Sequence, residues 1–190
     1  MSSVDRIALY KRLLLRWTET VNLVGPEARR NIDEHIEEAL AAARILKPRG
    51  DVLDVGSGGG LPAIPMAIVT PEARFHLVEA DQKKWAFLKH VVRECALNSE
   101  ILGDRLEHIA PRLDAGLQFS LVTSRAVGHT EEWIPVIAPR IALGGIVALF
   151  EGEIDPPAID GFRKIGKHKL PRGDANFLLI LEKFHVKQHG

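Results

Sequence analysis

Hydrophobic residues recur at helical spacing in the first third of the chain. From residue 4 to 17 they are three or four positions apart, which places them on one face of an amphipathic helix. These residues are Ile7, Tyr10, Leu14 and Trp17. A second pattern of this kind runs from about residue 30 to 46 and ends before Pro48, because proline cannot continue a helix. The pattern predicts a helical extension over residues 1–47.

From residue 51 the hydrophobic pattern becomes that of short buried strands. Residues 52–55 predict the first strand, a glycine-rich turn follows, and Pro62 suits the first turn of the next helix. Strands and helices then alternate, with strands near 74–79, 99–103, 118–123 and 145–150 and helices near 82–96, 104–112 and 131–140. Because strands that alternate with helices pair in parallel, this order predicts a doubly wound parallel sheet.

Two strand-like runs near the C-terminus flank a cluster of turn residues. Residues 168–171 and 177–181 lie on either side of Arg172, Gly173 and Asp174, which predicts an antiparallel hairpin. Five parallel strands closed by such a hairpin resemble the class I S-adenosylmethionine methyltransferase fold, a Rossmann-like α/β architecture. We therefore expect a single methyltransferase domain over residues 1–190, with the α/β core at 48–190.

Composition is that of an ordinary globular domain. Hydrophobic residues make up 46% of the 190 residues, and Lys plus Arg equal Asp plus Glu at 25 each, so overall charge does not indicate a nucleic-acid binder. Basic residues do gather in residues 161–190, where they could hold phosphates or only solubilise the surface. The single cysteine, Cys95, and the lack of an apolar run of about 20 residues predict a cytoplasmic protein without a membrane span.

The glycine-rich turn directly after the first strand carries the strongest chemical signal. Gly56, Gly58 and Gly60 fit G-x-G-x-G, whereas the dinucleotide fingerprint needs a glycine where Leu61 stands. Pro62 removes one N–H group from the helix start that a pyrophosphate would use. S-adenosylmethionine has no phosphate, so the loop favours that cofactor, and a purely structural turn is the alternative.

Polar residues follow the next three strands. Glu79 lies 23 positions after Gly56, near the spacing of about 20 at which an acid binds ribose hydroxyls. Asp104 and Glu107 fit either a contact with adenine or a helix capping box with Asp104 as the N-cap. Arg125 suits the methionine carboxylate of the cofactor or an RNA phosphate, and a surface ion pair is the alternative.

Together these motifs resemble the RsmG family, also called glucose-inhibited division protein B. The resemblance covers nearly the whole chain. It rests on Trp17, Asn22-Leu23, His35-Ile36, residues 53–65, Lys83, Phe87-Leu88, residues 104–107, residues 122–126 and Lys169-Leu170-Pro171. It implies transfer of a methyl group from S-adenosylmethionine to N7 of a guanine in the decoding-region loop of 16S rRNA, with the small ribosomal subunit as partner and no metal.

The resemblance also implies site residues. Cofactor contacts are expected at Gly56, Leu61, Leu106, Glu107 and Arg125, in addition to Gly58, Gly60 and Glu79. RNA contacts are expected at Asn22, His35 and Arg125. We name no catalytic base, because N7 of guanine attacks through an in-plane lone pair and loses no proton.

The chain departs from the family pattern at three places. Glu79 stands for the usual Asp, Glu38-Ala39 stands for Asp-Ser, and Phe150 stands where the family has a Lys. Two alternatives therefore stay open: a small-molecule methyltransferase on the same scaffold, and a non-catalytic relative that binds RNA or a nucleotide.

Overall fold

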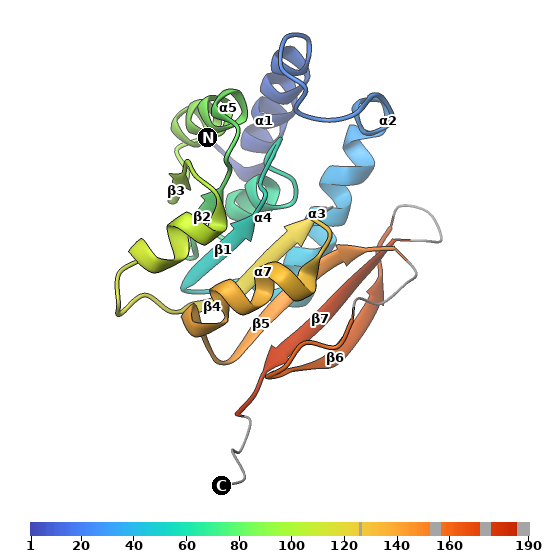
Figure 1. Cartoon of the computed structure of the whole chain (residues 1–190). Helices are drawn as coiled ribbons and strands as arrows, with labels where there is room; N and C mark the ends of the chain where they lie inside the picture. The colour runs from blue at the N-terminus through green and yellow to red at the C-terminus, as the bar shows by residue number, and fades with distance from the viewer. Residues whose placement is uncertain (126, 153–156, 172–175, 186–190) are drawn as a thin grey trace, which may run out of the picture.

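A mixed β-sheet forms the centre of the computed structural model, which describes residues 1–125, 127–152, 157–171 and 176–185. The strands are β1 (Asp51–Val55), β2 (Arg74–Val78), β3 (Ser99–Leu102), β4 (Phe119–Arg125), β5 (Ile141–Glu151), β6 (Phe162–Lys169) and β7 (Phe177–Lys183). Their order across the sheet is β3-β2-β1-β4-β5-β7-β6 (Figure 1). The first five strands pair in parallel, and β6 and β7 form an antiparallel hairpin beside β5.

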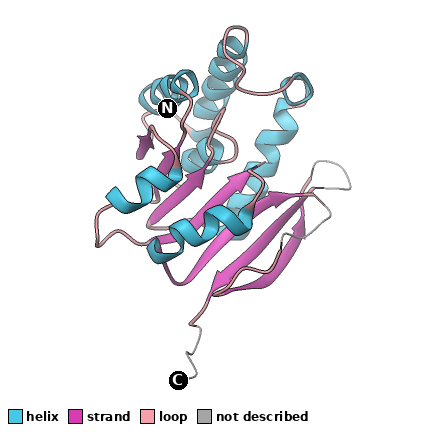
Figure 2. Cartoon of the chain, in the orientation of Figure 1, coloured by secondary structure: helices cyan, strands magenta, loops and turns pink. Residues whose placement is uncertain are grey.

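Helices cover both faces of this sheet (Figure 2). One face carries α1 (Ser3–Thr18), α3 (Ile32–Leu46), α4 (Ala63–Val69) and α5 (Gln82–Glu94). The other carries α6 (Leu106–Ile109) and α7 (Thr130–Ile137). Because successive side chains of a strand point to opposite faces, Leu121 packs in the first core and Val122 in the second.

The N-terminal helices belong to the first core. A capping box closes the start of α1, where the Ser2 side chain accepts from the Asp5 backbone and the Asp5 side chain accepts from the Ser2 backbone. Tyr10 and Leu14 of α1 are fully buried in the first core, between the helices and the sheet. The extension therefore lies directly over the core, and the short helix α2 (Pro26–Arg30) joins α1 to α3.

The predicted order of five parallel strands and a C-terminal hairpin is confirmed. The helix expected from about residue 30 begins at Ile32, and Pro26 starts the separate helix α2. Strands β5 and β6 begin earlier than expected, at Ile141 and Phe162. These first residues precede the apolar runs from which the strands were predicted, but they already pair with the neighbouring strands β4 and β7. The predicted turn at residues 172–174 lies outside the described residues. No described helix has the length and apolar character that crossing a membrane requires.

Candidate cofactor and RNA site

The predicted site residues come from one edge of the sheet. The chain winds from β1 through β2 to β3 on one side and from β4 to β5 on the other, so β1 and β4 mark the switch point. In such sheets ligands bind outside the carboxyl ends of the strands at this point. The glycine loop follows β1, Glu79 follows β2, and Arg125 ends β4, so all three lie at this edge.

The three glycines of the loop differ in what surrounds them. Gly56, Gly58 and Gly60 all have positive φ, at 73°, 53° and 85°. A Cβ on Gly56 would lie 2.5 Å from Val127 Cγ2, and one on Gly60 would lie 2.5 Å from Ile64 Cγ1. A Cβ on Gly58 would have no atom nearer than the Gly56 carbonyl oxygen, at 3.8 Å. Packing thus demands glycine at 56 and 60, whereas Gly58 borders open space that a ligand can enter.

Glu79 turns toward the glycine loop. Its Oε2 accepts a hydrogen bond from the Gly58 backbone N–H at 2.8 Å, and its Oε1 accepts from the Asp81 N–H at 2.8 Å. The residue is only 8% exposed. Because each carboxylate oxygen has a second lone pair, both can still accept a hydroxyl hydrogen from a ligand. The loop and the acid are therefore parts of one structure.

Asp54 is a buried acid that the sequence analysis passed over. Its Oδ1 accepts from the Thr123 hydroxyl at 2.6 Å, and its Oδ2 has no hydrogen-bond partner within the described residues. Burial raises the pKa of Asp54 to about 7, against a smaller lowering by the Thr123 hydrogen bond. The signal in the sequence was an acid inside the apolar strand β1, two positions before Gly56.

Arg125 is held by two residues of α3. Its Nη2 donates to Glu38 Oε2 at 2.9 Å and to His35 Nδ1. The Glu38 side chain is 1% exposed and that of Arg125 is 17% exposed, so this ion pair is not a surface pair. Phe150, the register partner of Arg125 on β5, places its ring centre 6.0 Å from the guanidinium carbon. Sequence reasoning missed Glu38 as the partner of Arg125.

A cavity of about 190 Å³ joins the glycine loop to Arg125. It is lined by Leu23, Val24, Ala28, His35, Gly56, Ser57, Gly58, Gly59, Leu61 and Arg125. The N-terminal extension forms one wall, and the Tyr10 hydroxyl donates to the Gly59 carbonyl oxygen at 2.7 Å. Another hollow, of about 370 Å³, lies between the end of α3 and the end of α4, away from the glycine loop.

The other predicted residues are not among those that line this cavity. Gly60 and Glu79 are in or beside the loop, and Leu106 and Glu107 begin α6 after β3, with Leu106 buried and Glu107 exposed. Of the residues expected to contact RNA, His35 and Arg125 share the cavity. Asn22 lines a neighbouring hollow of about 310 Å³ with residues 18–21 and part of α2.

The capping box expected at Asp104 and Glu107 is wrong. The N-cap of α6 is Arg105, and it makes no side-chain cap hydrogen bond. The Asp104 carboxylate lies within 3.0 Å of His108 Nδ1 and 2.9 Å of Arg112 Nη2. The His108 hydrogen bond first, then one from the Arg105 backbone N–H and one from Arg112, lower the pKa of Asp104 to about 2. The two basic side chains thus hold the acid one position before the cap.

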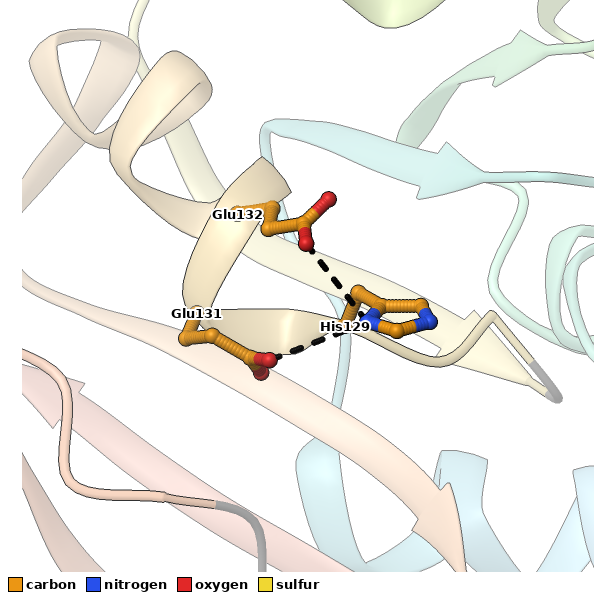
Figure 3. Close-up of side chains that lie close together, drawn as sticks. All are labelled: His129, Glu131 and Glu132. Carbon is orange, nitrogen blue, oxygen red and sulfur yellow. Dashed lines mark ion pairs between the residues drawn. The ribbon is translucent and has the colours of Figure 1, made fainter.

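His129, Glu131 and Glu132 gather at the start of α7 (Figure 3). His129 Nδ1 lies 3.8 Å from a Glu131 oxygen and 3.5 Å from a Glu132 oxygen. All three side chains are exposed, and the two acids suit the first turn of a helix. Since this group sits in solvent as ion pairs, it gives no reason to assign a metal, and the expectation of a metal-free protein stays a prediction.

Comparison with known proteins identifies the family. A family model described as GidB, rRNA small subunit methyltransferase G, matches residues 3–164. The chain belongs to this family. Relatives named ribosomal RNA small subunit methyltransferase G include that of Helicobacter bizzozeronii, 35% identical over 77% of this chain and 81% of the relative. That of Helicobacter acinonychis (strain Sheeba) is 40% identical over 76% of this chain and 79% of the relative.

Solved structures agree on the fold. A mutant of MtNAS in complex with S-adenosylmethionine has a TM-score of 0.66 at 16% identity and covers 95% of this chain and 76% of its own. TrmN from Thermus thermophilus has a TM-score of 0.60 at 20% identity, covering 77% and 48%. The predicted Rossmann-like methyltransferase fold and the resemblance to the RsmG family are confirmed. Membership of the family makes S-adenosylmethionine-dependent methylation of rRNA the activity of this chain.

Proposed function

We propose that this RsmG-family chain methylates N7 of a guanine in the decoding-region loop of 16S rRNA, in the cytoplasm. Family membership supports small-subunit rRNA as the substrate. The choice of N7 is carried by one observation, the lack of a carboxylate in the wall of the described cavity. An exocyclic amine must lose a proton when it is methylated, whereas N7 attacks through a lone pair and loses none.

The lining of the cavity contains no carboxylate, and His35 is its one candidate base within the described residues. A guanidinium only donates hydrogen bonds, and the Arg125 Nη2 group donates to His35 Nδ1. The same nitrogen lies 3.3 Å from Glu38 Oε2, so His35 Nδ1 contacts two neighbouring side chains. The one candidate base of the cavity is thus bound to Arg125 and Glu38, which suits a nucleobase that keeps its protons.

The residues present fit the cofactor, which supplies an electrophilic methyl group on a sulfonium. Gly58 leaves space where a Cβ would stand, and the Glu79 oxygens keep acceptor capacity for ribose hydroxyls. Leu106 and Glu107, after β3, would flank the adenine, and Arg125 would bind the methionine carboxylate. With no base required, the chain contributes alignment of the reacting groups and exclusion of water.

The decisive test is methylation of ribosomal material. The protein is incubated with S-adenosylmethionine labelled in the methyl group and with either unmodified 30S subunits or naked 16S rRNA, and the RNA is then cleaved chemically at 7-methylguanine. We expect one cleavage site, in the decoding-region loop. Label in the rRNA without such cleavage would contradict N7 as the target. Label only in small molecules would favour the small-molecule alternative, and absence of S-adenosylmethionine binding in calorimetry would favour a non-catalytic relative.

A further inference from the structure

The hollow of about 370 Å³ lies at the edge of the sheet opposite the glycine loop. Helices α3 and α4, which pack against each other, both end beside it. Its wall is completed by residues that lead into β1 and β2, which begin at Asp51 and Arg74. Strand β1 runs from this edge to the glycine loop, and its five residues span about 17 Å. The hollow is therefore separate from the cofactor cavity, and its volume is that of a small-molecule site.

Three cationic side chains border this hollow. Arg44 stands in the last turn of α3, Lys47 caps that helix, and Arg49 follows two positions later. All three are exposed, and their side chains have no hydrogen-bond or ion-pair partner in the part of the chain that the structure describes. One acid, Glu72, shares the wall. Because three cations face one carboxylate, the hollow attracts an anion.

Lys47 occupies a backbone position that favours glycine. Its φ is 47° and its ψ is 61°, the left-handed conformation that commonly ends a helix. Glycine adopts this conformation without a steric cost, whereas a lysine does not. A cation at the end of a helix also interacts favourably with the helix dipole, which is the structural alternative to ligand binding. Replacement by glycine removes the ammonium group and relieves the backbone, so this position allows a test without loss of the fold.

The rest of the wall combines apolar groups with hydrogen-bond acceptors. Leu40, Ala43 and Val69 supply apolar side chains. The buried Thr70 hydroxyl donates to a backbone carbonyl oxygen at 2.8 Å, and its oxygen can still accept a hydrogen bond. The Glu72 carboxylate accepts hydrogen bonds from hydroxyl or amino groups. The hollow thus matches a ligand that has a phosphate, an apolar ring and hydrogen-bond donors.

We propose that this hollow binds a nucleoside phosphate, with the phosphate held by Arg44, Lys47 and Arg49 and the base or sugar against the apolar wall. An inorganic anion would leave the apolar wall unused, and a fatty acid would offer no donor to Glu72. A free nucleotide and an unpaired nucleotide of a bound RNA present the same groups, so both are sources of this ligand. The inference does not depend on methyl transfer or on the target base.

The first test is calorimetry with uridine 5′-monophosphate in the presence of saturating S-adenosylmethionine, which fills the cofactor cavity. The uracil ring is neither the adenine of the cofactor nor the guanine of the substrate. We expect the wild type to bind this nucleotide, and Lys47→Gly and Arg49→Gln to bind it about tenfold more weakly, because each loses one charge-assisted contact. Uridine without phosphate should bind the wild type and both variants equally weakly. The control Arg12→Gln removes an exposed arginine of α1 outside the hollows described above and should bind as the wild type does.

The second test distinguishes the two sources of the ligand. A 16S rRNA fragment is titrated with the same proteins, with and without uridine 5′-monophosphate. If the ligand is a nucleotide of the RNA, the monophosphate competes with the fragment, and Lys47→Gly and Arg49→Gln bind the fragment more weakly. If it is a free nucleotide, these two variants bind the fragment as the wild type does and lose only the monophosphate.

The inference is overturned if neither the monophosphate nor the RNA fragment depends on Lys47 and Arg49, or if Arg12→Gln loses as much affinity as they do. Urea unfolding should show Lys47→Gly to be no less stable than the wild type. Lower stability of Lys47→Gly with unchanged binding would assign Lys47 to the helix end alone and would also overturn the inference. A failure of the proposed function would appear differently, as rRNA that is not methylated while the monophosphate still binds.

Discussion

Gly58 gives the sharpest test of where the cofactor binds. With φ at 53°, an alanine there would adopt a left-handed conformation, which costs an L-residue about 1–2 kcal/mol. Its Cβ would meet no protein atom closer than 3.8 Å. Gly60→Ala carries the same conformational cost plus a Cβ contact of 2.5 Å with Ile64 Cγ1, and overpacking of this kind costs about 1–3 kcal/mol more. We therefore expect losses of stability of about 1–2 kcal/mol at 58 and about 2–5 kcal/mol at 60.

Affinity for S-adenosylmethionine should follow the opposite order from stability, with the larger loss in Gly58→Ala and the smaller in Gly60→Ala. In Gly58→Ala the new methyl group stands in the space assigned to the ligand, and a steric cost of about 1–3 kcal/mol would weaken S-adenosylmethionine binding roughly five- to 150-fold. Urea unfolding gives the free energy of unfolding, and calorimetry on the folded protein gives the dissociation constant. A Gly58→Ala protein that is folded and binds the cofactor as tightly as the wild type would refute the position proposed for the ligand.

Three further changes test the surroundings of the cavity. Glu38→Ala removes the buried acid that pairs with the Arg125 guanidinium, and it should lower the free energy of unfolding in urea by about 3–5 kcal/mol. The control Glu37→Ala, on the exposed side of α3, should lower it little. Similar losses in both variants would contradict the ion pair. For Asp54, the pKa is about 7 in the folded protein against 3.8 for the free side chain, so the folded state favours the protonated acid. The stability of the wild type relative to Asp54→Asn should therefore fall by about 3 kcal/mol as pH rises from 4 to 7, and a constant difference across that range would disprove the shift. Tyr10→Phe removes the donor to the Gly59 carbonyl and should cost about 1–3 kcal/mol together with some affinity for S-adenosylmethionine, while unchanged values in urea and in calorimetry would show that the hydroxyl is dispensable.

The features that the sequence predicts well are those determined by a few neighbouring residues. The change from helical to strand spacing near residue 51 marks β1, and the glycine spacing marks the loop whose positive φ values are observed. The parallel pairing of the first five strands follows from the alternation of strands and helices. The place of Glu79 opposite the loop follows in turn, because β1 and β2 are neighbours and end together.

The features that the sequence did not predict depend on distant packing. Glu38 meets Arg125 across 87 positions, and only the placement of α3 over the sheet brings them together. Asp104 has the right residue type for an N-cap, but its carboxylate contacts the side chains of His108 and Arg112 instead. Asp54 was visible as an acid in an apolar strand. Its raised pKa, and the Oδ2 atom without a hydrogen-bond partner among the described residues, appear only when the layers on both sides are in place.

The contact between Tyr10 and the glycine loop has a consequence for the design of truncated or chimeric forms of this enzyme. Helix α1 supplies the hydroxyl that fixes Gly59, and the segment after it supplies Leu23 and Val24 to the cavity wall. A protein shortened to begin at residue 48 would retain every strand but would lose one side of its own ligand chamber. The first 47 residues are therefore a structural part of the catalytic unit, and swapping them between relatives would exchange a portion of the binding site along with them.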